Sequence, residues 1–262
     1  MRALVRPPSS RLAEGLLTHQ ERQSVDIDLA RRQWAGYVET LMDHGVDIVE
    51  LPMLEDCPDG VFVEDTLVVR GDLAVITRPA HPSRQPEVAS AREAVASMGY
   101  RLSDVTDPGF LEGGDVLSVG ETTYVGHTLR TNPEGIAQLA RSLQGETVAV
   151  PLSKVLHLKS AVTALPDGRI IGYPDLVDDP SAFPQFRAVP EPSGAHVVLL
   201  DDEHLLMAAS APRSAALFAD WGYRPVTVDI SEFEKLEGCV TCLSVRLRTP
   251  PSSTGSAPAP RR

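Results

Sequence analysis

Residues 116–152, VLSVGETTYVGHTLRTNPEGIAQLARSLQGETVAVPL, contain the pattern that decides the fold. The stretch 116–126 has two apolar-alternating runs around a short Gly-containing turn, which predicts a β-hairpin. Asn132-Pro133 then combines a helix cap with proline at the first helical position, and helical apolar spacing continues to Gly145. A glycine just past a helix end closes the last turn, and the strand-like ETVAVPL follows it. The stretch therefore predicts a strand-strand-helix-strand unit.

The same order of elements recurs along the chain. Three further helical segments end at Gly45, Gly99 and Gly222 and run directly into the strand-like VDIVELP, YRLSDV and YRPVTVDI. Other hairpin signals are TLVVRGDLAVIT, AVTALPDGRIIGY and HVVLLDDEHLLMA. Residues 174–188 stand where a further helix is due, but prolines interrupt them, so this unit is expected to be degenerate.

Units of this size cannot bury a core alone, so they are expected to pack around a common axis. The prediction is an α/β fold, a five-bladed pseudo-symmetric propeller built from strand-strand-helix-strand units. The hydrophobic pattern alone leaves an ordinary mixed α/β sandwich open as the alternative.

A side chain capable of chemistry follows each helix-closing glycine, just ahead of the next hairpin. These side chains are Asp65, Glu112, His157 and Cys242. Equivalent positions in pseudo-symmetric units come together at one end of the axis. The repeat therefore predicts one site with two carboxylates, an imidazole and a thiol, in which Cys242 lies within an apolar, strand-like run.

Cys242 and His157 have the residue types of a nucleophile and its base in covalent catalysis. Glu112 would orient and polarise the imidazole or bind the substrate. Taken singly, a histidine is usually structural and a buried cysteine is usually inert packing. The shared position in the repeat favours the catalytic interpretation.

Acidic residues gather ahead of the strand TLVV, at Asp59, Glu64 and Asp65. Buried acids are costly unless a cation meets them. Strand alternation puts Glu64 and Asp65 on opposite faces unless the chain bends there, and Asp65 is preferred for the pocket. Carboxylates beside a thiol suit a guanidinium, which pairs with them in a bidentate geometry.

Arg84 and Arg130 occupy matching places after Asp65 and Glu112. Both are expected to clamp a substrate carboxylate. For either one alone, a solvated arginine near a helix start is the better interpretation.

The amino-acid composition limits the possible binding partners and cellular location of the protein. The net charge of −12 over 262 residues argues against nucleic-acid binding, since no basic stripe can neutralise phosphates. No apolar run approaches the roughly 20 residues of a spanning helix, and the N-terminus lacks an apolar signal region. Three cysteines without a framework spacing indicate free thiols and a cytoplasmic location.

Residues 1–248 are expected to form one domain, and the Pro/Ser/Ala-rich residues 249–262 a disordered tail.

Six ordered motifs between Val5 and Leu247 resemble the dimethylarginine dimethylaminohydrolases of the guanidino-group-modifying (pentein) superfamily. The motifs are CPDGVFVEDT, ITRPAHPSR, LEGGDVL, LRTN, LHLKS and TCLSVRL. The resemblance implies a five-bladed α/β propeller and hydrolysis of N-methylated arginine to citrulline and a methylamine. It makes Cys242 the nucleophile, His157 the proton donor and later base, and Glu112 its carboxylate partner, where some members use Asp.

The resemblance also implies a substrate-binding set and no metal ion or cofactor. Asp59, Glu64 and Asp65 would hold the guanidinium and amino ends of the substrate, with Arg84 and Arg130 on its carboxylate. Leu17 would be a lid residue, with Leu16 as its rival, and Leu236 would offer backbone to the amino acid head group. The oligomeric state stays open between monomer and homodimer.

Three other functions remain as alternatives. A deiminase acting on arginine or another guanidino compound would differ only in the space around the distal guanidinium nitrogens. Cys239 and Cys242 form a C-x-x-C, but redox motifs of this kind open a helix, and a zinc site needs further ligands. Cys239 is therefore expected to be incidental. A catalytically silent arginine-binding protein is disfavoured while Cys242, His157 and Glu112 are all present.

The acids also bear on the state of the nucleophile. Carboxylates near Cys242 should raise the pKa of its thiol in the empty site. A bound cationic substrate is therefore expected to help generate the thiolate.

Overall fold

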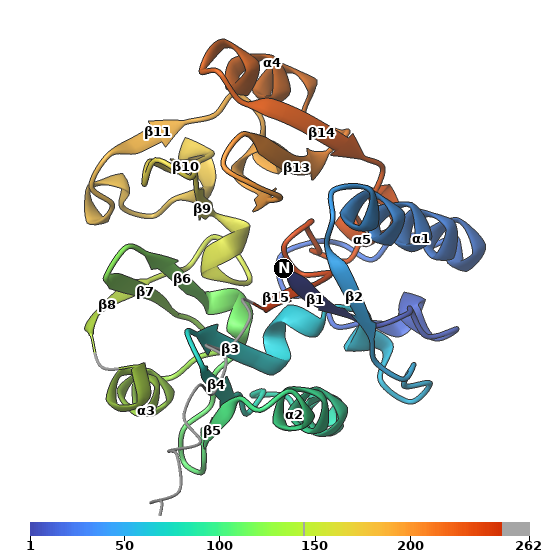
Figure 1. Ribbon diagram of the computed structural model, residues 1–262, viewed down its shortest axis with the longest axis vertical. Coiled ribbons are helices and arrows are strands. Elements are labelled where there is room, and N and C mark those ends of the chain that lie inside the picture. The colour runs from blue at the N-terminus through green and yellow to red at the C-terminus, as the bar shows by residue number, and fades with distance from the viewer. Residues whose placement is uncertain (144, 248–262) are drawn as a thin grey trace, which may run out of the picture.

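The computed structural model describes residues 1–143 and 145–247, which form five small sheets of three strands each. The sheets are arranged around a common axis, and helices α1 to α4 lie on the outside of the ring (Figure 1). In every sheet two strands are antiparallel, and the middle strand pairs in parallel with the third. The predicted five-bladed α/β propeller is confirmed. The predicted tail, residues 249–262, lies outside the described residues, and the extent of the domain stays a prediction.

Four blades follow one another along the chain. The first has β3 (Leu67–Arg70), β4 (Leu73–Ile76), α2 (Val88–Ser97) and β5 (Arg101–Asp104). The second has β6 (Val116–Val119), β7 (Thr122–His127), α3 (Pro133–Leu143) and β8 (Glu146–Pro151). The third has β9 (Val162–Ala164), β10 (Ile170–Gly172) and β11 (Phe186–Ala188). The fourth has β12 (Val197–Leu199), β13 (His204–Ala208), α4 (Pro212–Asp220) and β14 (Arg224–Val228), followed by the short α5 (Ser231–Glu234).

The fifth blade joins the two ends of the described chain. It consists of β1 (Arg2–Val5), α1 (Ile27–Asp43), β2 (Asp47–Glu50) and β15 (Val245–Leu247). β15 runs antiparallel to β1, with Arg2 opposite Leu247 and Leu4 opposite Val245. This pairing closes the ring and fixes the chain just after Cys242.

The degenerate unit is confirmed. Between β10 and β11 the chain forms two short 3-10 helices, Pro174–Leu176 and Pro180–Ala182, in place of an α-helix. Pro180 and Pro184 fall inside this segment, and a proline fits the first turn of a helix but not its interior, so no longer helix runs through these residues.

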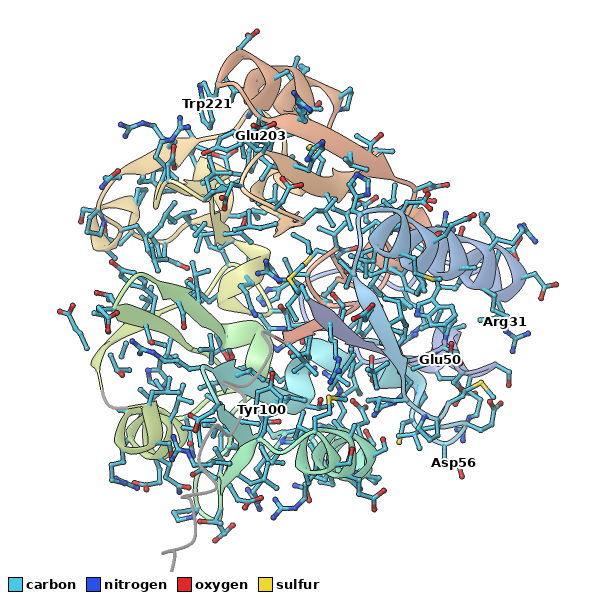
Figure 2. All side chains as sticks on the ribbon, viewed as in Figure 1. Arg31, Glu50, Asp56, Tyr100, Glu203 and Trp221 are labelled. Atoms are coloured by element: carbon cyan, nitrogen blue, oxygen red, sulfur yellow. The ribbon has the colours of Figure 1, made fainter. Side chains whose placement is uncertain are left out.

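Neighbouring blades share their hydrophobic cores. Val75 of β4, Val125 of β7 and Leu139 of α3 belong to one buried cluster that spans two blades. Burial between blades explains why one unit alone could not fold. Charged side chains such as Arg31, Glu50 and Glu203 lie exposed around the outer rim (Figure 2). Among the described residues, no helix combines the length and apolar character needed to span a membrane.

Candidate active site

Asp65, Glu112, His157 and Cys242 lie in or directly before short turns that precede the first strand of a blade. Three of these turns are 3-10 helices, Val63–Thr66 before β3, Gly113–Asp115 before β6 and Leu158–Ser160 before β9. Residues 239–244 form the equivalent turn before β15. Because the blades are pseudo-symmetric and the 3-10 helices contact one another, their side chains meet at one end of the axis. The turn before β12 contributes none of the predicted residues.

These turns surround a small, partly open cavity. The predicted residues that line it are Asp59, Asp65, Arg84, Arg130, His157, Leu236 and Cys242. Leu16, Phe62, Leu156, Glu237 and Gly238 complete the lining. The cavity measures about 20 Å³, roughly the space of one water molecule. An amino acid therefore enters only if part of the wall moves.

Two acids of the VEDT motif take different places. Both Glu64 and Asp65 are buried, because the chain bends into a 3-10 helix here and does not continue as a strand. Asp65 lines the cavity, as preferred from the sequence. Glu64 lies beside it and accepts hydrogen bonds from Lys159 Nζ at 2.6 Å and Thr241 Oγ1 at 2.9 Å.

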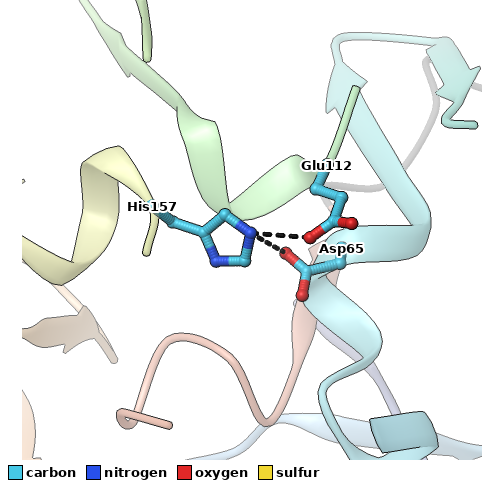
Figure 3. Close-up of side chains that lie close together, drawn as sticks. All are labelled: Asp65, Glu112 and His157. Carbon is cyan, nitrogen blue, oxygen red and sulfur yellow. Dashed lines mark hydrogen bonds and ion pairs between the residues drawn. The ribbon is translucent and has the colours of Figure 1, made fainter. Parts of the chain in front are cut away.

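His157 is held by two carboxylates (Figure 3). Its Nε2 lies 2.7 Å from Glu112 Oε2 and 3.9 Å from Asp65 Oδ1. Gly114 passes so close that an added Cβ would lie 2.7 Å from both His157 Nδ1 and Asp65 Oδ1. Its backbone N–H donates to Asp65 Oδ1 at 2.9 Å. Gly114 is therefore required for the close approach of backbone to the imidazole, and Gly113 for the close approach to the backbone carbonyl of Glu64.

The buried charges set the protonation of this group. Burial disfavours the imidazolium, but Asp65 and the hydrogen bond to Glu112 outweigh it and raise the pKa of His157 to about 9. Burial likewise opposes the carboxylate of Asp65, yet His157 and Arg84 lower its pKa to about 2. Near neutral pH the site therefore contains a protonated imidazole between ionised carboxylates.

Arg84 is the second cation of this cluster. Its Nη1 lies 2.8 Å from Asp65 Oδ2 and 3.5 Å from Glu112 Oε2. Its Nε and Nη2 donate to the buried Glu87 at 3.1 and 2.9 Å. The guanidinium is thus engaged on all sides, whereas the Arg130 guanidinium, among residues 1–143 and 145–247, makes one 3.4 Å contact, to Glu112 Oε1.

Asp65, Glu112 and His157 also have the donor atoms of a metal site. One atom from each lies within 4.8 Å of the others. A metal ion there would face repulsion from the Arg84 guanidinium, which already neutralises both carboxylates. The contacts favour arginine as the cation of the cluster, and the expectation of no metal ion or cofactor stays a prediction.

Asp115 is a site residue that the sequence analysis missed. It is fully buried and accepts hydrogen bonds from Leu158 N at 2.9 Å, Thr128 Oγ1 at 2.8 Å and Thr131 Oγ1 at 2.6 Å. Thr131 Oγ1 in turn accepts the backbone N–H of Glu112 at 3.2 Å. The Asp115 carboxylate therefore binds the backbone of Leu158, next to His157, and through Thr131 it also supports the backbone of Glu112. The signal was present in LEGGDVL, where an acid follows two glycines and precedes a buried strand.

Cys242 does not lie in a strand, and that part of the sequence prediction is wrong. Its backbone N–H donates to Cys239 O at 3.1 Å, so residues 239–242 form a turn, and the strand begins only at Val245. The residues around Cys242 are apolar because the turn is buried, so their apolar character did not distinguish a turn from a strand. The contact with Cys239, burial and the charges of Glu64 and Asp65 all raise the pKa of the Cys242 thiol, in the direction expected.

The N-terminal segment covers the cavity. Leu16 lines it and donates its N–H to Asp59 Oδ1 at 3.1 Å, whereas Leu17 is half-buried and packs against the core. Glu237 Oε1 accepts the backbone N–H groups of Thr18 at 3.0 Å and Gln20 at 2.7 Å, with His19 between them. Of the two lid candidates, the structure thus places Leu16 at the cavity.

Comparison with known proteins agrees with these features. A family model described as N,N dimethylarginine dimethylhydrolase, eukaryotic, matches residues 17–180. The N(G),N(G)-dimethylarginine dimethylaminohydrolase of Streptomyces coelicolor is 60% identical over 250 residues, covering 94% of this chain and 97% of that protein. This chain belongs to the dimethylarginine dimethylaminohydrolase family. The Pseudomonas aeruginosa protein of the same name is 34% identical over 93% of this chain and 98% of its own length. The resemblance inferred from the six motifs is confirmed.

A solved structure of the family and one of an arginine dihydrolase have the same fold. A cysteine-to-serine variant of the P. aeruginosa enzyme in complex with citrulline has a TM-score of 0.87 at 33% identity, covering 94% of this chain and 98% of that one. The N-terminal domain of a cyanobacterial arginine dihydrolase has a TM-score of 0.85 at 20% identity, covering 95% and 98%, which shows the fold alone.

Proposed function

We propose that this protein hydrolyses Nω-methylated L-arginine to L-citrulline and a methylamine or dimethylamine. It is then a hydrolase acting on the C–N bonds of amidines. The observation that carries the proposal is the single cavity lined by the Cys242 thiol, the His157 imidazole and the carboxylates of Asp59 and Asp65, in a chain of this family. A thiol can attack the guanidinium carbon, and buried acids can hold the cation in place.

The protonation state fits the first half of the reaction. With a pKa of about 9, His157 carries a proton near neutral pH and can give it to the departing alkylamine. The Cys242 sulfur then holds the substrate carbon as an S-alkylthiouronium. His157, now neutral, accepts a proton from the water that attacks this carbon, and citrulline leaves with the thiolate restored.

The nucleophile needs help to ionise. The pKa of Cys242 is raised by Cys239, by burial and by the nearby carboxylates, so the thiol is mostly protonated in the empty site. A guanidinium placed between the thiol and Asp65 adds positive charge beside the sulfur. Binding of substrate thus favours the thiolate at the moment it is needed.

The two arginines are assigned by the contacts that each already makes. Within the described part of the chain, Arg130 makes one side-chain contact, to Glu112, and is the better clamp for the substrate carboxylate, while Arg84 fixes the acids. Asp65 takes the guanidinium, with Glu64 behind it. Asp59 and the backbone of Leu236 take the amino end. Leu16, rather than Leu17, closes over the bound molecule.

A Cys242→Ser substitution tests the function. We expect citrulline release from asymmetric dimethylarginine to disappear while dimethylarginine still binds by calorimetry. Cys57→Ser, a buried thiol outside the cavity, is the matched control and should retain activity. Citrulline formation by Cys242→Ser would overturn the assignment. Assaying monomethylarginine, arginine and agmatine beside dimethylarginine decides between this hydrolase and a deiminase.

A further inference from the structure

The thiol next to the nucleophile is not isolated from it. Cys239 Sγ and Cys242 Sγ lie 3.2 Å apart, and both residues are buried. Cys239 was expected to be incidental because its C-x-x-C does not open a helix. The structure brings the two sulfurs into direct contact without a helix, so the pair needs its own explanation.

The backbone holds the two cysteines within reach of a covalent bond. The hydrogen bond from Cys242 N to Cys239 O, 3.1 Å long, closes a four-residue turn. Such turns bring the first and fourth Cα atoms within about 7 Å of each other. Disulfides span Cα separations of about 4.4–6.8 Å. Closing the bond therefore requires movement of side chains and little movement of the chain.

We propose that Cys239 and Cys242 form a reversible disulfide when the protein meets a hydroperoxide, and that this modification switches the enzyme off. The proposal rests on the proposed role of Cys242 as the nucleophile. A sulfur bonded to Cys239 cannot attack a guanidinium carbon.

The chemistry proceeds in two balanced steps. The minor fraction of Cys242 that is ionised attacks one peroxide oxygen, an S–O bond forms, the O–O bond breaks, and hydroxide or alkoxide leaves. The sulfur is now oxidised to a sulfenic acid and the peroxide is reduced. The Cys239 thiolate attacks this sulfur, an S–S bond forms, the S–O bond breaks, and hydroxide leaves. The protons of the two thiols neutralise the two departing anions.

The surroundings assign different roles to the two thiols. Cys242 lines the cavity, whereas Cys239 lies behind it, so a small peroxide meets Cys242 first. Thr241 Oγ1 donates its one hydrogen to Glu64 Oε2 at 2.9 Å, so at its 3.3 Å contact with Cys239 the thiol is the donor. This chain of hydrogen bonds gives the proton of Cys239 a path to a carboxylate when that sulfur attacks.

Peptide mapping after mild treatment with hydrogen peroxide tests the proposal on the full chain. Trypsin releases residues 236–246 as one peptide that contains both cysteines and not Cys57. We expect this peptide to lose two hydrogen atoms and to resist alkylation by iodoacetamide. Citrulline release should fall ~10-fold or more and return with dithiothreitol, since a disulfide is reducible and higher sulfur oxides are not.

Two variants distinguish the disulfide from irreversible oxidation of Cys242. The activity of each variant is normalised to its own activity before treatment. Cys57→Ser should behave as the parent. At a peroxide dose that inactivates the parent, Cys239→Ser should recover less activity with dithiothreitol than the parent does, because part of its sulfenic acid proceeds to the sulfinic acid, which dithiothreitol does not reduce. Equal recovery in Cys239→Ser and the parent, or a peptide that stays alkylatable while activity falls, would overturn the proposal. If the disulfide forms in a protein that releases no citrulline even when reduced, the modification stands and the proposed function fails.

Discussion

The cavity has two walls that are built in different ways. The catalytic wall consists of Asp65, Glu112, His157 and Arg84, which are all buried and joined by ion pairs between side chains. The covering wall consists of residues 16–20. The backbone N–H of Leu16 donates to Asp59, and those of the exposed Thr18, His19 and Gln20 donate to the half-buried Glu237.

The catalytic wall holds the reacting groups, whereas the covering wall controls the entry of substrate. Removing one partner of a buried ion pair lowers the free energy of unfolding by about 3–5 kcal/mol, because the remaining charge is left unpaired. Exposed hydrogen bonds can exchange with water at little net cost. The catalytic wall therefore stays in place, and the covering wall is the part that moves when substrate enters a cavity that holds about one water molecule.

The largest effect is expected for Glu112→Gln, which removes a charge from the catalytic wall. The amide can still contact His157, but it no longer stabilises the imidazolium, so the pKa of His157 should fall. We expect kcat to drop about 100-fold or more, as is typical when general acid catalysis is lost. Glu121→Gln, an exposed glutamate on the β6–β7 hairpin, is the matched control. An unchanged kcat with an unchanged pH profile would contradict the role of Glu112.

The same wall should make stability depend on pH. The pKa of His157 is about 9 in the folded protein against an ordinary 6.5, so the folded state binds the extra proton between these values. The stabilisation is complete below pH 6.5, declines above it and is lost as pH rises through 9. This proton contributes at most on the order of 3 kcal/mol to the free energy of unfolding. Urea unfolding of the wild type and of His157→Gln, compared from about pH 6 to 10, measures it; parallel curves would refute it.

The contrast between the walls also explains what the sequence could reveal. The repeat of hairpin, helix and strand was readable because each helix ends at a glycine and each strand is apolar. The positions of Asp65, Glu112 and His157 followed from the repeat itself. Pseudo-symmetry converts a spacing in the chain into proximity in space, so no side-chain geometry was needed.

Other features depend on contacts that a linear pattern does not encode. The pairing of β15 with β1 joins residues from opposite ends of the chain. Arg84 was expected to clamp substrate, but its place among Asp65, Glu87 and Glu112 arises from tertiary contacts. The turn at Cys242 looked like a strand because burial of any backbone selects apolar residues.

A smaller effect is expected for Asp115→Asn. The amide oxygen can still accept the N–H of Leu158, so the fold should survive, but the charge that helps to raise the pKa of His157 is lost. We expect kcat to fall about 10-fold, KM to change little and the alkaline limb of the pH profile to move to lower pH. Asp72→Asn, a half-exposed residue paired with Arg101, is the control. A loss of thermal stability with no shift of the alkaline limb would mean that Asp115 only supports the fold.

The smallest effect is expected for Glu237→Ala, in the covering wall. This change removes the acceptor of three successive N–H groups, from Thr18 to Gln20, and none of the groups that carry out the chemistry. The segment then opens more often, so we expect KM to rise about 3–10-fold while kcat stays within about 2-fold. Hydrogen exchange at residues 18–20 should accelerate in the same variant. Glu39→Ala, an exposed glutamate of α1, should change neither KM nor exchange. If Glu237→Ala lowered kcat as strongly as Glu112→Gln does, the two walls would not be separate, and Glu237 would belong with the chemistry.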